Sequence, residues 1–365
     1  MNIIIFILVL GILVFVHELG HFLFAKLFKV RVDEFGFGYP PRLAKLFTFK
    51  GTLVTLNWIP FGGFVKIFGE SDDGNELSPE EKKVSLVYKP RWQQILVMFG
   101  GILFNIIFAW VLFSGVYMAG VTTSVSGAPS NYIFEETKLV VTAIAPDSPA
   151  NEAGLFPGDE IKEYYNDEKV VTVTNEDITD VSDFVNETGI AGDNIGIVVL
   201  RDNKLEVIDL IPQKGIVNDR YAVGINVDRV GEMSLPIHQA LWYGAKNTVV
   251  FLGAIAEGFW YLISGQISTD NVSGPVGIVE QIGDASTIGL SYLISFMALL
   301  SLNLAILNLI PFPALDGGRI LIIIIEAIRR KRLAPRIVNW VNTIGFFALI
   351  LLMLVITVKD VVNLF

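Results

Sequence analysis

Long apolar runs divide this chain into segments that cross a membrane and segments that do not. Four runs reach roughly the 20 residues that a helix needs to cross about 30 Å of hydrocarbon. They cover residues 2–28, 95–119, 288–312 and 337–358, and predict about four transmembrane helices. A fifth stretch, residues 238–263, is interrupted by charges and has aromatic residues near its ends, which favours an interfacial amphipathic helix over a fifth crossing.

Between the second and third runs the pattern changes to short β-branched segments. Residues 138–144 and 195–200 are rich in Val and Ile, and Gly, Asp and Asn turn signals separate such segments. This pattern is typical of a small mixed β domain, expected over residues 126–230. The first half of a membrane core, 1–120, precedes this domain, and the interfacial helix and the second half, 231–365, follow it.

The charge of the connecting segments predicts their sides of the membrane. Residues 26–91 carry 11 Lys and Arg against 8 Asp and Glu, and residues 319–336 carry 6 against a single Glu. Residues 121–238 carry 8 basic against 21 acidic side chains. By the positive-inside rule we expect the first and third connections in the cytoplasm, the β domain outside, and both termini outside.

Composition excludes several classes of protein. The formal net charge is −10, which argues against a nucleic-acid partner, because phosphate binding requires a basic surface. The chain has no cysteine, so disulfides, zinc-thiolate sites and thiol catalysis are excluded.

The sequence His-Glu-Leu-Gly-His at 17–21 interrupts the first apolar run. On a helix, His17 and His21 lie on one face, about 6 Å apart along the axis, so both imidazoles can reach one metal ion. Glu18 can then take a proton from water at the metal, as in zinc peptidases. The alternative is a pair of helix-facing histidines with an exposed glutamate. Because a charged residue in a membrane segment costs roughly 2.5–3.5 kcal/mol, the pattern favours the metal site.

A catalytic zinc site usually has three protein ligands and an open position for water. One candidate for the third ligand is His238, which the expected topology places on the outer side. The other is Asp316, expected at the cytoplasmic end of the third crossing, at the same depth as His17 and His21. Asp316 could instead begin a helix as its cap or pair with Arg319.

Proline residues interrupt the chain just before Asp316. Pro311 and Pro313 remove backbone donors, which is tolerated at membrane depth only where protein or water satisfies the freed groups. The segment therefore predicts a hydrated pocket. Asn303 and Asn308 are candidates to line it, or to form hydrogen bonds between helices.

Residues 51–58 and the following Pro60-Phe-Gly-Gly63 indicate a β-hairpin-like element within 51–69. It could be an ordinary cytosolic hairpin. It could also present an edge strand beside the metal, holding an unwound substrate by β-addition.

Together these motifs resemble the site-2 protease family of intramembrane zinc metalloproteases, specifically its bacterial RseP-like branch. The resemblance covers nearly the whole chain and includes a single PDZ-like domain. Its landmarks are the segments 17–21, 60–66, 100–105, 274–278 and 303–317.

The resemblance implies that His17, His21 and Asp316 bind one zinc ion. It implies that Glu18 is the base and proton shuttle, and that segment 51–69 folds back into the membrane beside the site. The expected substrate-binding residues are Asn303, Asn308, Gly62, Gly63 and Asn105.

Residues 145–161 resemble the bacterial PDZ signature. Ser148 and the following Pro and Ala are expected to open a short helix that ends at a glycine cap, Gly154. The domain could bind a peptide or protein ligand in its groove, or act only as a filter that excludes substrates with large outer domains, which we favour. Some members of the family carry two PDZ domains, and this chain has room for one.

The expected function is zinc-dependent cleavage of transmembrane segments of single-span proteins, in regulated intramembrane proteolysis. The expected location is the bacterial cytoplasmic (inner) membrane, with the active site near the cytoplasmic side. One alternative is a PDZ-bearing membrane scaffold with a structural metal, against which the intact Glu18 argues. A metal transporter is another, but it would need more polar residues along the crossings than the chain offers.

Overall fold

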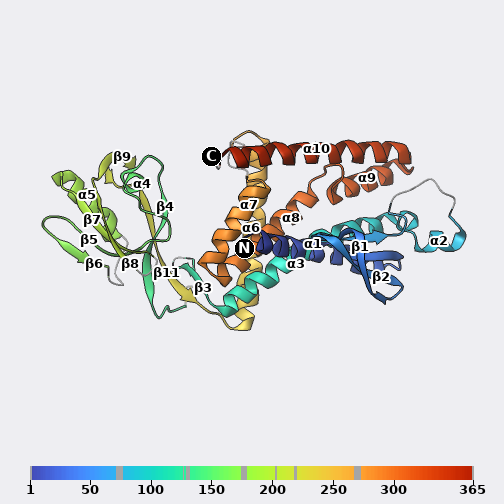
Figure 1. Cartoon of the computed structure of the whole chain (residues 1–365), viewed down its shortest axis with the longest axis horizontal. Coiled ribbons are helices and arrows are strands. Elements are labelled where there is room, and N and C mark those ends of the chain that lie inside the picture. The colour runs from blue at the N-terminus through green and yellow to red at the C-terminus, as the bar shows by residue number, and fades with distance from the viewer. Residues whose placement is uncertain are drawn as a thin grey trace. The chain divides into compact units, whose positions relative to one another are not determined.

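The structure is a computed structural model, and the chain folds as two compact units (Figure 1). Unit 1 comprises Met1–Met118 and Pro236–Phe365, and unit 2 comprises Ala119–Leu235. The structure describes residues 2–70, 77–125, 127–128, 132–173, 179–201, 204–217, 220–266 and 273–363.

Within the described part of unit 1, four helices are long and apolar enough to cross a membrane, which confirms the predicted number. They are α1 (Asn2–Leu27), α3 (Arg91–Ala119), α8 (Leu290–Leu309) and α10 (Pro335–Asn363). The remaining helical elements of this unit are α2 (Pro79–Val84), the 3₁₀ turn η1 (Leu86–Tyr88), α6 (Ile237–Ile263), α7 (Pro275–Ile288) and α9 (Asp316–Arg329).

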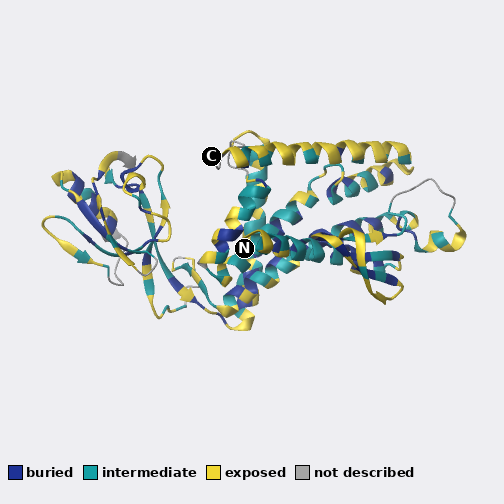
Figure 2. Ribbon diagram, viewed as in Figure 1, coloured by how far each residue is buried: buried dark blue, intermediate teal, exposed yellow. Residues whose placement is uncertain are grey.

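The surface of α10 shows why this unit needs a lipid environment. Large apolar side chains remain exposed along the helix, and Phe347 and Leu351 are each 64% exposed. Figure 2 shows exposed residues along most of its length. A helix that is apolar without being covered by protein requires another apolar medium, because water would penalise the exposed area.

Helix α6 has 27 residues and covers the stretch for which an interfacial helix was expected. It is not among the four candidate spans. It packs against α8 and α3. With α3 it forms two hydrogen bonds: the Trp110 indole N–H donates to the carbonyl of Leu241 at 2.9 Å, and the Asn247 amide donates to the Tyr117 hydroxyl at 2.6 Å. These hydrogen bonds fix α6 against the membrane core.

Strands β1 (Val32–Phe49) and β2 (Thr52–Ile67) form an antiparallel hairpin in which both strands bend. The first part of β1 lies between the two parts of β2, so that Phe35 pairs with both Val54 and Val65. Residues 63–67 therefore form one edge of this small sheet, and pair only with the first part of β1 among the described residues.

The hairpin is longer than the sequence suggested. Segment 51–69 supplies the turn and β2, but its partner β1 comes from residues 32–49, which the sequence analysis did not assign to a strand. Residues 36–41 contain two glycines and two prolines, a composition that usually marks a turn. Here they form the bend of β1, where Gly38 has a φ of +77°.

Unit 2 is a β domain, as predicted. Its main sheet has the strand order β3-β11-β4-β5-β7-β8, with β6 paired to β5, and all these pairs are antiparallel. The strands are β3 (Val121–Ser124), β4 (Thr137–Ile144), β5 (Glu160–Tyr165), β6 (Val170–Thr172), β7 (Ile195–Arg201), β8 (Lys204–Leu210) and β11 (Ile225–Met233). A separate pair is formed by β9 (Gln213–Val217) and β10 (Arg220–Ala222).

Two helices complete unit 2 and give it a core of its own. They are α4 (Pro149–Glu152) and α5 (Thr179–Ala191). Ser148 caps α4, accepting a hydrogen bond from the Asn151 N–H, and Gly154 follows the helix with a φ of +80°, as the signature predicted. Fully buried Ile195 and Ile197 of β7 lie in a core shared with residues of both helices.

Candidate metal centre and active site

The two histidines of the first apolar run lie on one face of α1, as their spacing predicted. Their Nε2 atoms are 3.1 Å apart, and the ring planes are nearly perpendicular, at 86°. Both residues are buried inside unit 1, with His17 7% and His21 5% exposed. They are therefore neither solvent-facing nor lipid-facing residues of the helix.

Asp316 joins them from a distant part of the chain. Its Oδ2 lies 3.0 Å from His17 Nε2 and 3.3 Å from His21 Nε2. These three residues form a group that could hold a metal ion. His238, the other candidate ligand, is exposed at the start of α6 and is not part of this group.

The break between α8 and α9 positions Asp316. Helix α8 ends at Leu309, the prolines follow, and α9 begins at Asp316 itself. A side chain at Gly317 would lie 2.3 Å from the Leu309 carbonyl oxygen, and one at Gly318 would lie 2.1 Å from that of Phe312. The two glycines therefore allow α9 to begin directly against the end of α8, with the carboxylate facing α1.

Asp316 has neither of the purely structural roles considered for it. The cap position of α9 is Leu315, and no side chain caps the helix. Arg319 forms its ion pair with Glu70, whereas the ionic partners of Asp316 among the described residues are the two histidines. Its Oδ2 is buried and, among the described residues, has no hydrogen-bond partner besides these two imidazoles.

The geometry fits a small tetrahedral cation. Zinc binds nitrogen and oxygen at about 2.0–2.1 Å, so neighbouring ligand atoms of a tetrahedral site are about 3.3–3.4 Å apart. The three atoms here are separated by 3.0, 3.1 and 3.3 Å. Because the Nδ1 of His21 lies 2.8 Å from the Val97 carbonyl oxygen, its proton belongs on Nδ1 and the Nε2 lone pair faces the cluster.

Helices α1 and α3 cross closely beside the His-His-Asp group. A side chain at Gly20 would lie 2.2 Å from the Gly100 carbonyl oxygen. One at Gly101 would lie 2.5 Å from His21 Nε2 and 2.7 Å from His17 Cε1. Small residues at a helix crossing let the backbones approach, and here they also leave room for the imidazoles.

Glu18 lies between the ligand group and the hairpin. It is half-buried, next to His17 in the chain, and its carboxylate faces the backbone N–H of Val65. A side chain at Gly62 would lie 2.7 Å from Val14, one turn before Glu18 on α1. The edge of β2 is therefore packed directly beside the glutamate.

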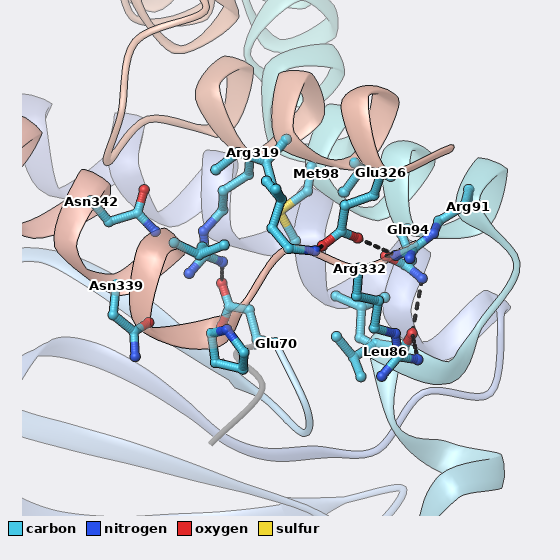
Figure 3. Close-up of a pocket in the computed structure, with 16 residues that line it drawn as sticks. Glu70, Leu86, Arg91, Gln94, Met98, Arg319, Glu326, Arg332, Asn339 and Asn342 are labelled. Carbon is cyan, nitrogen blue, oxygen red and sulfur yellow. Dashed lines mark hydrogen bonds and ion pairs between the residues drawn. The ribbon is translucent and has the colours of Figure 1, made fainter. Parts of the chain in front are cut away.

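One cavity adjoins the site, and a second cavity adjoins the first. The first has a volume of about 460 Å³ and is lined partly by Asp316, which leaves space for several waters. The other, of about 90 Å³, shares Glu70, Arg319 and Asn342 with it. Figure 3 shows this smaller cavity, with the Arg319 guanidinium directed at the Glu70 carboxylate.

The other expected site residues occupy different surroundings. Asn303 and Asn308 are half-buried in the last two turns of α8. Gly63 allows a close approach of the strands, since a side chain there would lie 2.8 Å from the Gly36 carbonyl oxygen. Asn105 is fully buried in α3, with its Nδ2 3.3 Å from His17 Nδ1.

Sequence reasoning missed three contributors to the site. The Val97 carbonyl and the Val65 N–H act through the backbone, so no residue type marks them. Gly101 is the exception, since it belongs to the Gly-Gly pair at 100–101, and small residues in a membrane helix are a signal for close packing.

Comparison with known proteins agrees with these features. The profile described as Peptidase family M50 matches residues 5–352. A Clostridium perfringens protein whose name describes it as a zinc metalloprotease is 36% identical over 369 residues, covering 99% of each chain. The regulator of sigma-W protease RasP of Bacillus subtilis is 30% identical over 441 residues, covering all of this chain and 99% of RasP.

A solved structure, the PDZ domain of an SdrC-like protein from Listeria monocytogenes, covers 27% of this chain and 93% of that domain. It is 20% identical, and its TM-score of 0.21 is too low to support an argument about the fold. The family match and the relatives extend over nearly the whole chain, including the segments that carry the His-His-Asp group. The chain therefore belongs to peptidase family M50, the site-2 protease family, and is a membrane zinc metalloprotease of the RseP-like branch.

Proposed function

We propose that this chain is an intramembrane endopeptidase that cleaves transmembrane segments of single-span proteins in regulated intramembrane proteolysis. The observation that carries this proposal is the meeting of His17, His21 and Asp316 beside Glu18, inside helices apolar enough to cross a membrane. A hydrolytic site enclosed by such helices would be in reach of peptide bonds that lie within the membrane.

In this proposal His17, His21 and Asp316 hold one zinc ion. When bound, zinc polarises the scissile carbonyl and lowers the pKa of the attacking water. Glu18 accepts the proton of that water and delivers it to the leaving amine. The Val65 N–H holds the Glu18 carboxylate on the side of the hairpin, between the metal ligands and the edge of β2.

The substrate is expected to bind as an extended strand, because a helix conceals the carbonyls that must be attacked. Residues 63–67 offer an edge for β-addition next to Glu18. Gly62 and Gly63 keep that edge close to α1 and β1. Asn303 and Asn308 would hydrogen-bond to the unwound substrate, where the half-buried end of α8 leaves them accessible.

We further propose that the protein lies in the bacterial cytoplasmic membrane, with unit 2 outside and the active site near the cytoplasm. The acidic character of unit 2 and the basic segment at 319–336 support this orientation. Unit 2 would act mainly as a filter against substrates with large outer domains, and peptide binding in its groove is the alternative. Membership of a peptidase family favours proteolysis over the scaffold and transporter alternatives.

The decisive test compares the wild type with Glu18→Gln, both purified in detergent, on a tagged single-span substrate, with bound zinc measured in parallel. The variant should retain zinc and lose cleavage by about 10²–10⁴-fold, the usual contribution of a general base. A matched control is Glu257→Gln in α6, where the carboxylate accepts a hydrogen bond from Tyr261 and lies outside the His-His-Asp group. The control should cleave as the wild type does.

Two outcomes would contradict the proposal. If Glu18→Gln cleaves as fast as the wild type, Glu18 is not the base. If the wild type holds zinc but cuts none of a panel of single-span substrates, the scaffold or transporter alternative becomes the better explanation.

A further inference from the structure

Asn105 is a buried polar residue whose surroundings the proposed function does not explain. It is 0% exposed in the middle of α3, so it has no surface to offer to a substrate. Its side-chain Nδ2 lies 3.3 Å from His17 Nδ1, while its Oδ1 is buried without a hydrogen-bond partner. Its backbone carbonyl accepts a hydrogen bond from the Ser301 hydroxyl at 2.8 Å, which fixes α3 against α8 at this point.

The requirements of His17 decide which end of the Asn105 amide should face the imidazole. The oxygen and nitrogen of a carboxamide have the same shape, so their assignment follows from the hydrogen-bond network. An amide N–H facing Nδ1 would place the imidazole proton on Nε2, the atom that lies 3.0 Å from Asp316. The oxygen facing Nδ1 would place the proton on Nδ1 and leave the Nε2 lone pair directed at the ligand group.

His21 already shows the second arrangement. Its Nδ1 faces a carbonyl oxygen, that of Val97 at 2.8 Å, which is also on α3. Val97 and Asn105 are eight residues apart, which is about 2.2 turns or 80° around the axis, and both lie on the broad side of α3 that faces the histidines of α1. With its amide oxygen turned to His17, Asn105 would give that imidazole the same kind of acceptor that the Val97 carbonyl gives His21.

We propose that Asn105 is a positioning residue of the metal centre, rather than a substrate-binding residue. Its side-chain oxygen accepts the Nδ1–H of His17 and thereby fixes the tautomer and ring orientation that present Nε2 to zinc. Such partners behind a ligating histidine typically change metal affinity by about 10–100-fold. This inference rests on the zinc site of the proposed function.

The test is the zinc affinity of the full-length protein in detergent, measured by competition with a chromogenic chelator. Asn105→Leu keeps the volume and removes the acceptor, so it should weaken zinc binding about 10–100-fold. Asn105→Asp restores an acceptor at the same place and should bind zinc within about tenfold of the wild type, or more tightly. With Co²⁺ in place of zinc, the visible spectrum should change in the Leu variant and stay close to wild type in the Asp variant.

The control variant is Ser301→Ala, which removes the hydrogen bond to the Asn105 backbone but leaves the side chain in place. It should lower the melting temperature of the metal-free protein without changing zinc affinity. If Asn105→Leu does not fold, Asn105→Asp still tests the inference, because a large loss of zinc affinity in the Asp variant would overturn it. Equal affinity in the wild type and the Leu variant would also overturn it. A wild type that binds no zinc would instead overturn the metal site itself.

Discussion

Gly101 shows how closely the ligand group is enclosed at the scale of single residues. It lies on the face of α3 that covers His17 and His21, where a methyl group would lie 2.5 Å from a ligand nitrogen. No ordinary side-chain contact is that short, so a larger residue must displace one or both rings. The position therefore acts on the metal centre without supplying a ligand.

We predict that Gly101→Ala lowers zinc content at a given free zinc concentration by at least tenfold, because displaced imidazoles lose the tetrahedral geometry. Gly115→Ala is a control on the same helix, since a side chain there would meet nothing within 4 Å. It should keep its zinc and gain a little helix stability, about 1 kcal/mol or less. If Gly101→Ala is fully occupied by zinc at limiting metal, α1 and α3 can move apart enough to accept the methyl group, and the prediction is wrong.

At the scale of elements, the β1–β2 hairpin contributes to the site through its packing against α1, and it supplies neither a candidate metal ligand nor the candidate base. The Phe15 ring of α1 stacks on Phe37 with ring centroids 4.9 Å apart, and it meets Phe35 edge-on at 5.6 Å. These aromatic contacts hold β1 against α1, and β1 in turn holds the edge of β2. A substrate strand added at this edge would therefore have a fixed distance from Glu18.

We predict that Gly62→Ala reduces cleavage of the single-span substrate while bound zinc is unchanged. A side chain at this position would lie 2.7 Å from Val14, so the edge of β2 must move away from α1. Gly51→Ala is a matched control, because it has the same φ of +77° but open space around it. Both variants pay the strain of a positive φ, about 1 kcal/mol or more, and only Gly62→Ala should lose activity.

Loss of zinc in Gly62→Ala would mean that the hairpin supports the metal ligands and not the substrate. Equal activity of the two variants would mean that the position of the β2 edge does not limit cleavage.

At the scale of the whole molecule, the candidate active site belongs to unit 1 alone. His17, Glu18, His21 and Asp316 all lie in that unit, although nearly 300 residues separate the first from the last. Unit 2 has its own core and is inserted through two neighbouring connections, since Val121 of β3 pairs with Met233 of β11. The points at which the chain enters and leaves unit 2 are therefore adjacent in that unit.

We predict that replacing residues 121–233 by a short Gly-Ser linker yields a protein that still binds zinc and cuts a small single-span substrate. The paired residues Val121 and Met233 are about 5 Å apart, so a few linker residues can span the gap. If unit 2 is a filter, the shortened protein should also cut substrates with large outer domains, which the full chain should leave intact. Unchanged selectivity, measured on a pair of substrates that differ only in the outer domain, would instead favour peptide binding.

The sequence by itself determined the four long apolar helices and the candidate chemistry of the site. The apolar runs identified the four long helices because lipid demands about 20 apolar residues whatever the fold. The spacing of His17 and His21 placed both on one helix face, because that follows from the helical repeat alone. Asp316 was identified as a candidate by its residue type, by its expected depth, and by the resemblance of segment 303–317 to the site-2 protease family.

Tertiary structure decided which distant groups meet. The approach of Asp316 depends on the close contact of Gly317 and Gly318 in α9 with the segment that ends α8, and the position of the β2 edge depends on bends in both strands of the hairpin. The partners of Asn105 and the N–H beside Glu18 are set by how α1, α3 and β2 pack. Such contacts join residues that share no sequence pattern, because their free energy depends on three-dimensional packing and not on local periodicity.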